Sequence, residues 1–323
     1  MTFVIALLRH SHFISQIFDL YYPWPYTRMK HLLEYNKTDL ALVIGNGINR
    51  YGAAEGMNSW EALLTKLARR HINPEHTRVP KGVSPTEFYD VLELAAARAE
   101  SGNSLQSQFC EQMSTWMSLP QHEHVAHWAK RASVPVLTTN FEETLSTPVS
   151  AKRSRCGKDK FTAFYPWSTC FSVKPVVDPL ATFAVWHMNG IQAYRQSIRL
   201  GLSHYMGSVE RARAWLHKSG NRLFGSEDIS MWPGSKTWLQ VFFHKPLLFF
   251  GLRLEENEVF LRWLLIERAR YFKKFPGRAK QGWYVYAQQE ANLDPGKSLF
   301  LKGVGIEPYP VATYDDIYAQ EIW

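Results

Sequence analysis

A strand-like run that ends in polar side chains is the first place in this sequence where chemistry could be done. Residues 134–142 begin apolar and end in Thr138, Thr139, Asn140 and Glu142. Ligands of open α/β sheets bind outside the carboxyl ends of the strands. There, an asparagine amide can hold a water or a ribose hydroxyl in a fixed direction, and an acid can accept hydrogen bonds from ribose or amide groups. The alternative is a strand end followed by a helix cap, which Thr and Asn also supply.

Two glycines follow an earlier apolar run at residues 40–44. Glycines directly after a strand let the backbone approach a pyrophosphate, and amide groups at the start of the next helix can hold it. The loop is not the oxidoreductase fingerprint, because the third glycine of G-x-G-x-x-G would fall at Arg50. The alternative is an ordinary tight turn. The candidate residues of this loop are Gly45, Asn46, Gly47, Ile48 and Asn49.

Two later strand ends carry a histidine and another glycine. His187 ends an apolar run and precedes a turn at Gly190, which suits a general base with a pKa near neutrality, although a single histidine is more often structural. Gly251 ends the run at 246–250, and the polar residues after it suit a wall that faces ribose or adenine. The alternative is that these acids face a helix dipole. The candidate residues here are Gly251, Leu252, Arg253 and Glu255.

The elements that must position these residues alternate between strand and helix. Besides the strand that begins at 134, apolar runs predict strands at 40–44, 182–187, 246–250, 283–287 and 306–311. Helical periodicity predicts helices from Ser59 and at 86–100, 105–117, 122–132, 205–218, 236–243 and 256–274. This alternation predicts an α/β fold, doubly wound, with a mostly parallel sheet.

One domain is expected over residues 38–323, preceded by an extension at 1–37. The aromatic and proline-rich run at 21–26 breaks any helix, and we expect the native start near Met29. Residues 146–182 hold four prolines and are expected to form a smaller, mainly helical insertion. A further helical segment is expected at about 200–235.

The composition limits the class of protein. The chain has 323 residues, of which 46% are apolar, and this supports a sizeable core. Its net charge is +8, with basic runs at 152–160 and 268–280. Solvated surface is the expected role of these runs, and attraction of a nucleic acid or another polyanion is the alternative. No segment is apolar for long enough to span a bilayer.

The cysteines and histidines give no sign of a metal centre. Cys110, Cys156 and Cys170 include no C-x-x-C pair, so neither a zinc ribbon nor a disulfide framework is expected. Widely spaced cysteines in odd number suit a reducing cytosol, and we expect a cytoplasmic protein. His124 and His127 could share a helical face, but a third ligand is not evident.

The order of the four segments resembles a sirtuin-like domain over about residues 38–320. Within that family, the chain is most similar to the divergent NAD-hydrolysing domains of bacterial antiviral defence proteins. On this resemblance, Asn140 and His187 match the catalytic asparagine and histidine, and Gly45 and Gly47 match the phosphate loop. Gly251 and the residues after it match the late loop near the adenosine ribose. Glu142 stands where the family usually has an aspartate.

The departures from the family's pattern concern mainly the handling of a peptide. The four-cysteine zinc module of the protein deacylases is absent, as are their Phe-Gly-Glu strand after the histidine and their Asp-Phe-Arg run after the glycine loop. The resemblance therefore implies a Rossmann-like sheet and a metal-free NAD+ hydrolase that produces nicotinamide and ADP-ribose, acting in antiphage defence by NAD depletion. The alternatives are NAD-dependent deacylation or ADP-ribosylation of protein, and a non-catalytic sensor or scaffold that binds NAD or ADP-ribose. Because a free NAD hydrolase is toxic, we expect control by homo-oligomerisation or a regulatory partner subunit.

Overall fold

The computed structural model describes residues 25–54, 56–75, 78–98, 104–157, 165–218, 220–256, 258–288 and 293–323. Of the expected extension, residues 1–24 lie outside these ranges. Residues 25–36 form helix α2 (Pro25–Asn36), which buries Met29, Leu32 and Leu33 against the sheet. The expected start at Met29 therefore falls inside a helix that packs on the fold.

The fold is built on one eight-stranded sheet of order β3-β4-β5-β2-β1-β6-β7-β8. The run from β5 to β8 is parallel, and β4 pairs antiparallel with both of its neighbours. The predicted α/β class with a mostly parallel sheet is confirmed. The strands are β1 (Ala41–Ile44), β2 (Val136–Thr138), β3 (Lys152–Arg155), β4 (Thr169–Ser172), β5 (Val185–His187), β6 (Leu247–Phe250), β7 (Gly282–Ala287) and β8 (Glu307–Val311).

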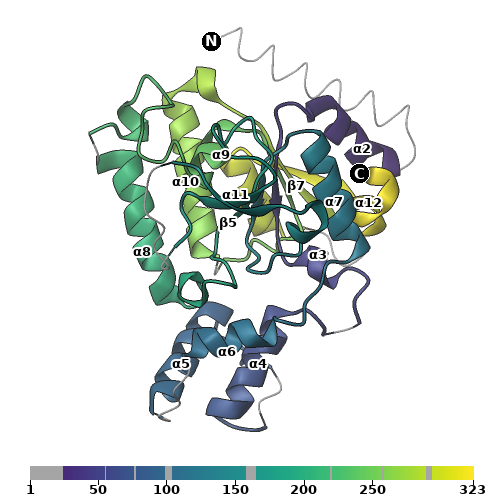
Figure 1. Cartoon of the computed structure of the whole chain (residues 1–323), viewed down its shortest axis with the longest axis vertical. Coiled ribbons are helices and arrows are strands. Elements are labelled where there is room, and N and C mark those ends of the chain that lie inside the picture. Colours follow the sequence, from purple (N-terminus) through teal and green to yellow (C-terminus); the bar gives the residue numbers. More distant parts are fainter. Residues whose placement is uncertain are drawn as a thin grey trace.

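Helices cover both faces of this sheet, so the doubly wound arrangement is also confirmed. Alternate residues of β1 enter different cores: Ala41 and Val43 belong to one apolar cluster, Leu42 and Ile44 to the other. On the first side lie α8 (Leu202–Arg213), the π-helix η3 (Ala214–Lys218), α9 (Trp238–His244), α10 (Val259–Lys274) and α11 (Pro295–Gly303). On the second lie α2, α7 (Pro120–Arg131), α12 (Asp315–Tyr318) and the 3₁₀-helix η6 (Gln320–Ile322) (Figure 1).

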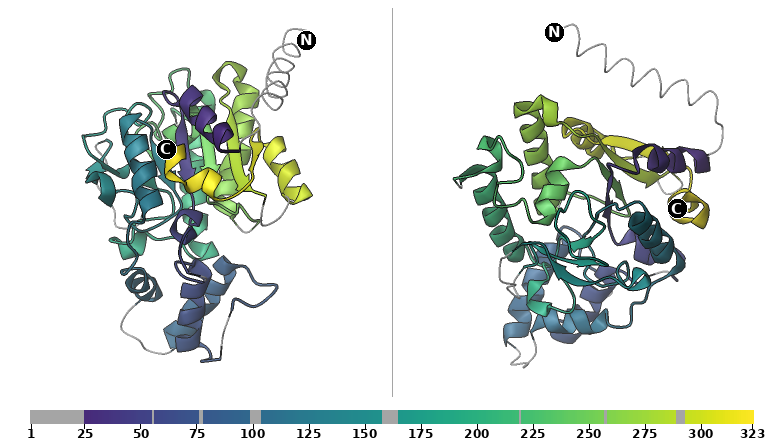
Figure 2. Two further views of the ribbon diagram at one scale, coloured as in Figure 1. Left: turned by 90° about the vertical axis from the view of Figure 1, so that its right-hand side faces the viewer. Right: turned by 45° about the horizontal axis from the view of Figure 1, so that its top comes forward.

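Three helices between β1 and α7 form a separate lobe at one end of the molecule (Figures 1 and 2). They are α4 (Trp60–His71), α5 (Pro85–Arg98) and α6 (Leu105–Gln112), which we call the helical lobe. It has its own apolar cluster, which also includes Met113 directly after α6 and three residues from distant parts of the chain: Phe141, Ile198 and Leu200.

The stretch 146–182, expected to be a helical insertion, instead adds β3 and β4 to the edge of the sheet. β3 consists of Lys152, Arg153, Ser154 and Arg155, none of which is buried. A charged edge strand shows no alternation of apolar residues, so its sequence did not identify it as a strand. The helical parts of 146–182 that the structure describes are limited to the 3₁₀-helix η1 (Thr147–Val149).

Single turns of helix fill the remaining connections. They are α3 (Gly47–Arg50), η2 (Arg195–Ser197), η4 (Leu223–Gly225) and η5 (Pro276–Arg278). The expected helical segment at 200–235 contains α8, η3 and η4.

The second basic run is partly structural. Arg268 on α10 is fully buried, and its guanidinium donates to the carbonyls of Phe242, Lys245 and Lys280 while lying over the ring of Phe272. This side chain joins the end of α9 to the segment before β7, so it is not available to a polyanion. In the first basic run, Lys158 and Lys160 lie outside the described residues.

Candidate functional site

The strand pairing brings the predicted catalytic residues together. β2 and β5 are parallel neighbours, with Thr138 opposite His187. β1 flanks β2 on its other side, with Ile44 opposite Thr138. The residues that follow these strands therefore meet at one edge of the sheet, where Asn140 Nδ2 donates to the carbonyl of Gly45 over 3.3 Å.

His187 has a defined tautomer. Its Nδ1 lies 2.8 Å from the carbonyl oxygen of Asn140. A carbonyl can only accept, so Nδ1 carries the proton and Nε2 presents a lone pair. Nε2 is buried and has no hydrogen-bond partner among the described residues. Burial lowers the pKa of His187 to about 4, against the opposing effect of the hydrogen bond to Asn140, so the ring is neutral at pH 7.

Asn140 supplies a second unpaired acceptor. Its Nδ2 is directed to Gly45, and its Oδ1 is buried without a partner among the described residues. The residue is only 1% exposed, and His187 is 0% exposed. A buried polar atom left unpaired typically destabilises a protein by about 1–3 kcal/mol. Because both unpaired atoms are acceptors, the group that would satisfy them must be a donor such as water or a sugar hydroxyl.

The two glycine segments pack against each other. Gly47 N–H donates to the carbonyl of Gly251 over 2.8 Å, and Gly45 N–H donates to Phe250 over 3.0 Å. A Cβ on Gly45 would lie 2.4 Å from the Gly251 carbonyl oxygen, and one on Gly47 would lie 2.6 Å from the Gly251 Cα. Gly251 itself has φ +68°, which favours glycine. Close packing therefore requires these glycines, and in this conformation the Gly47 N–H is already used.

A buried network joins the glycine loop to the end of β2. Asn49 Nδ2 donates to Glu142 Oε1 (2.7 Å) and to Asn46 Oδ1 (2.8 Å). On α7, His122 Nδ1 accepts from the Leu119 N–H, so its Nε2 must be the protonated nitrogen that donates to Asn49 Oδ1 over 2.9 Å. Burial lowers the pKa of His122 to about 4, which keeps this ring neutral.

Within this network the Glu142 carboxylate accepts three hydrogen bonds and so holds the segment after β2 against the glycine loop. Besides Asn49, its carboxylate accepts from the Phe141 N–H and from Thr144 Oγ1, at 3.2 and 3.3 Å. Burial raises its pKa, and these three donors oppose that rise. The sequence did not point to His122, because the neighbouring His124 and His127 matched a metal-ligand spacing and no local pattern links His122 to Asn49, 73 residues away.

The remaining candidates lie around this edge with less direct roles. Thr138 Oγ1 donates to the Ile44 carbonyl (2.9 Å), and Asn189 Nδ2 donates to the Thr139 carbonyl (3.2 Å). Ile48 is an apolar core residue.

The late loop holds its candidates through backbone contacts and one ion pair. Tyr284 donates to the carbonyls of Leu252 and Arg253, and the Leu252 side chain lies beside Gly45. Arg253 and Glu255 are exposed, and Glu255 is ion-paired with Lys297 at 3.2 Å.

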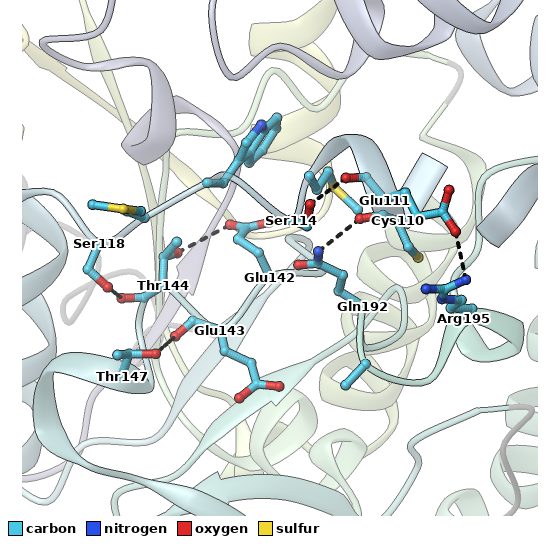
Figure 3. Close-up of a pocket in the computed structure, with 14 residues that line it drawn as sticks. Cys110, Glu111, Ser114, Ser118, Glu142, Glu143, Thr144, Thr147, Gln192 and Arg195 are labelled. Carbon is cyan, nitrogen blue, oxygen red and sulfur yellow. Dashed lines mark hydrogen bonds and ion pairs between the residues drawn. The ribbon is translucent and has the colours of Figure 1, made fainter. Parts of the chain in front are cut away.

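A cavity of about 720 Å³ opens beside Glu142, between the end of α6 with the segment after it and the loops that follow β2 and β5 (Figure 3). This volume is within the range of small-molecule sites. Its charged lining residues are Glu111, Glu142, Glu143 and Arg195, and Arg195 is paired with Glu111 at 3.0 Å. Three carboxylates and one guanidinium make an unfavourable environment for a pyrophosphate, so a dinucleotide would place its phosphates elsewhere.

Across the described ranges, no group of three or more His, Cys, Asp or Glu side chains is placed to hold a metal ion. The three cysteines are free and buried. In the part of the chain that the structure describes, no helix is both long and apolar enough to cross a membrane. In comparisons with known proteins, the chain matches no family model and no curated protein.

Proposed function

We propose that this protein is an NAD+ hydrolase that cleaves the bond between nicotinamide and ribose, giving nicotinamide and ADP-ribose. The observation that supports this most is the pair of unpaired buried acceptors, Asn140 Oδ1 and His187 Nε2, at the ends of neighbouring parallel strands. Their chemistry suits a ribose hydroxyl and an attacking water. The resemblance of the segment order to NAD-hydrolysing domains adds to it.

The reaction needs little acid assistance, because the nicotinamide of NAD+ is already a cationic leaving group. As the C1′–N bond breaks, its electron pair leaves with nicotinamide and positive charge develops at C1′, as in glycoside hydrolysis. Asn140 Oδ1 accepts from water or a ribose hydroxyl and fixes its direction. The water oxygen bonds to C1′ and its proton passes to His187 Nε2, which the Nδ1–H bond to the Asn140 carbonyl holds in place.

Access to the site is part of the proposal. Asn140 and His187 are buried in this structure, so a substrate reaches them only after the parts of the chain that cover them move. The Gly47 N–H would likewise have to leave the Gly251 carbonyl before it could hold a pyrophosphate. A covered resting state suits an enzyme whose activity would be harmful without a trigger, as in antiphage defence, with control through homo-oligomerisation or a partner subunit.

The covered state of the site favours a second candidate function. The Gly47 N–H is already paired, and the unpaired acceptors of Asn140 and His187 are buried. These features also suit a sensor or scaffold that binds NAD or ADP-ribose without turnover. A third class, transfer of ADP-ribose to protein or deacylation, would require a place for a peptide.

Chromatography of NAD incubated with the purified protein separates these candidates. Hydrolysis predicts loss of NAD with nicotinamide and ADP-ribose formed one to one. Calorimetric binding of NAD with no product would favour the sensor, and nicotinamide without free ADP-ribose would indicate transfer. Either of these two results would refute the proposed hydrolysis.

A further inference from the structure

The helical lobe contacts the chain directly next to both candidate catalytic residues. On the β2 side, Phe141 follows Asn140 and is fully buried in the apolar cluster of the lobe. Its ring stacks on Trp60 of α4 with centroids 4.8 Å apart and meets the edge of Phe109 of α6 at 6.1 Å. The backbone of Asn140 is therefore anchored, one residue away, by side chains of the lobe.

On the β5 side, the loop after His187 is compact. Gly190 has φ +109°, and a Cβ there would lie 2.3 Å from the Ser197 carbonyl oxygen. Arg199 N–H donates to the Asn189 carbonyl over 2.7 Å. Residues 189 and 190 thus rest on residues 197–199, so a shift of one end of the loop would move the other.

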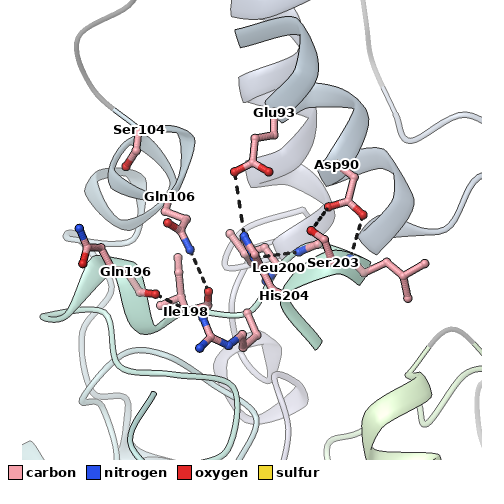
Figure 4. Close-up of polar contacts among 12 residues, drawn as sticks. Asp90, Glu93, Ser104, Gln106, Gln196, Ile198, Leu200, Ser203 and His204 are labelled. Atoms are coloured by element: carbon pink, nitrogen blue, oxygen red, sulfur yellow. Dashed lines mark hydrogen bonds and ion pairs between the residues drawn. The ribbon is translucent and has the colours of Figure 1, made fainter. Parts of the chain in front are cut away.

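The far end of that loop is held by the lobe (Figure 4). Gln106 of α6 donates to the Ile198 carbonyl over 3.1 Å. Asp90 of α5 accepts from the Leu202 N–H (2.9 Å) and from Ser203 Oγ (3.1 Å), so it caps the first turn of α8. Gly201 permits this approach, because a Cβ there would lie 1.9 Å from Asp90 Oδ1.

The two sides are also joined to each other. Gln192 N–H, in the loop after β5, donates to the carbonyl of Phe141 over 2.8 Å. The cavity beside Glu142 is lined by α6 with the segment after it and by the loops after β2 and β5, so this interface is not completely packed. The lobe therefore meets the loops after β2 and β5 through one shared apolar cluster and a few hydrogen bonds, with the cavity at its edge.

We infer that Trp60 and Asp90 are positioning residues, through which the helical lobe sets the placement of Asn140 and His187 respectively. This inference rests on the proposed function for its catalytic consequence, but the mechanical coupling itself does not require NAD. A signal that moved the lobe would displace both catalytic residues together.

Hydrogen exchange tests the coupling without reference to activity. Trp60→Leu should speed exchange at least tenfold in residues 138–145, and Asp90→Ala should do so in residues 188–204, while β6 keeps its protection. Trp60→Phe, which keeps an aromatic ring against Phe141, and Asp90→Asn, which keeps an acceptor, should restore most of the protection. The matched control is Trp263→Leu: Trp263 is also a half-buried helical tryptophan stacked on a phenylalanine, Phe260, but on α10.

Kinetics gives the second readout. Displacement of the catalytic groups should lower kcat for NAD at least tenfold in Trp60→Leu and Asp90→Ala, with KM changed less than threefold, and the conservative variants should recover it. Exchange within twofold of wild type in both segments would overturn the inference, as would the same increase in Trp263→Leu. If Trp60→Leu does not fold, Asp90→Ala decides, and exchange in residues 188–204 within twofold of wild type would then overturn the inference. Coupled exchange in a protein that never cleaves NAD would instead refute the proposed function and leave the positioning role standing.

Discussion

Packing between the glycine loop and Gly251 predicts an unusually large effect for one added methyl group. In Gly251→Ala, the new Cβ would lie 2.7 Å from the hydroxyl oxygen of Tyr318 and 3.2 Å from the carbonyl oxygen of Gly45. The residue also has φ +68°. Alanine at positive φ costs about 1 kcal/mol, and overpacking a tight site adds typically about 1–3 kcal/mol. We therefore expect a loss of about 2–4 kcal/mol in the free energy of unfolding.

The chain offers a matched control for the backbone contribution. Gly305 has φ +75°, and a Cβ there would meet nothing within 4 Å, so Gly305→Ala should lose only about 1 kcal/mol. The difference between the two variants measures the packing alone. Tyr318→Phe removes the nearest atom, so Gly251→Ala should be milder in that background, a coupling that a double-mutant cycle measures.

Equilibrium unfolding in urea at pH 7 measures the wild type, the three single variants and the Gly251→Ala/Tyr318→Phe double variant. Unchanged m-values would show that the denaturant midpoints report stability. The packing account of the glycines would be refuted if Gly251→Ala and Gly305→Ala lost the same free energy. In that case close packing would not explain why Gly45, Gly47 and Gly251 are glycines, and the close approach of a pyrophosphate would be the alternative explanation.

Three further predictions concern the buried network around Asn49 and the buried histidines. Asn49→Ala should destabilise the fold by about 2–5 kcal/mol, because it leaves the buried His122 Nε2–H unpaired and removes the shortest of the three hydrogen bonds to the buried Glu142 carboxylate; a loss below about 0.5 kcal/mol in urea unfolding would contradict this. His122, His187 and His244 all have a pKa lowered to about 4 by burial. Because the unfolded rings protonate near pH 6.5, stability is fully present above that pH and should fall as the pH drops from about 6.5 to 4, by up to about 3 kcal/mol per ring. Thermal melts across this range should show the loss, and His244→Gln should make it shallower; a flat profile would count against burial of the neutral rings. NAD turnover, measured where circular dichroism shows the protein still folded, should persist down to about pH 5, whereas a loss with a midpoint near 6.5 would mean that His187 titrates as an exposed ring.

Most of the fold follows from local sequence, as two elements illustrate. β1 and β6 are short apolar runs closed by Gly45 and Gly251, and both were predicted because strands buried on two faces show continuous apolar residues. β3 was missed because it lies at the edge of the sheet, where its mainly basic residues are exposed. Its sequence therefore shows no alternation of apolar and polar residues.

The candidate site was predictable in outline but not in its contacts. Asn140 and His187 could be placed together because parallel strands end at the same edge of a sheet. The pairing of Gly47 with Gly251, and of Asn49 with Glu142 and His122, joins residues far apart in sequence through side-chain packing. Local patterns do not encode such contacts, so the hydrogen bonds of Glu142 and the contacts of the helical lobe with residues next to Asn140 became visible only in the structure.

The central claim is that Asn140 and His187 cleave NAD. Its most direct test is nicotinamide release from NAD by the wild-type protein, Asn140→Ala and His187→Ala, with His127→Ala as a control at an exposed histidine. Release by the wild type and His127→Ala, and its loss in the other two variants while they remain folded by circular dichroism, is the predicted result. Full release by both Asn140→Ala and His187→Ala would contradict the claim.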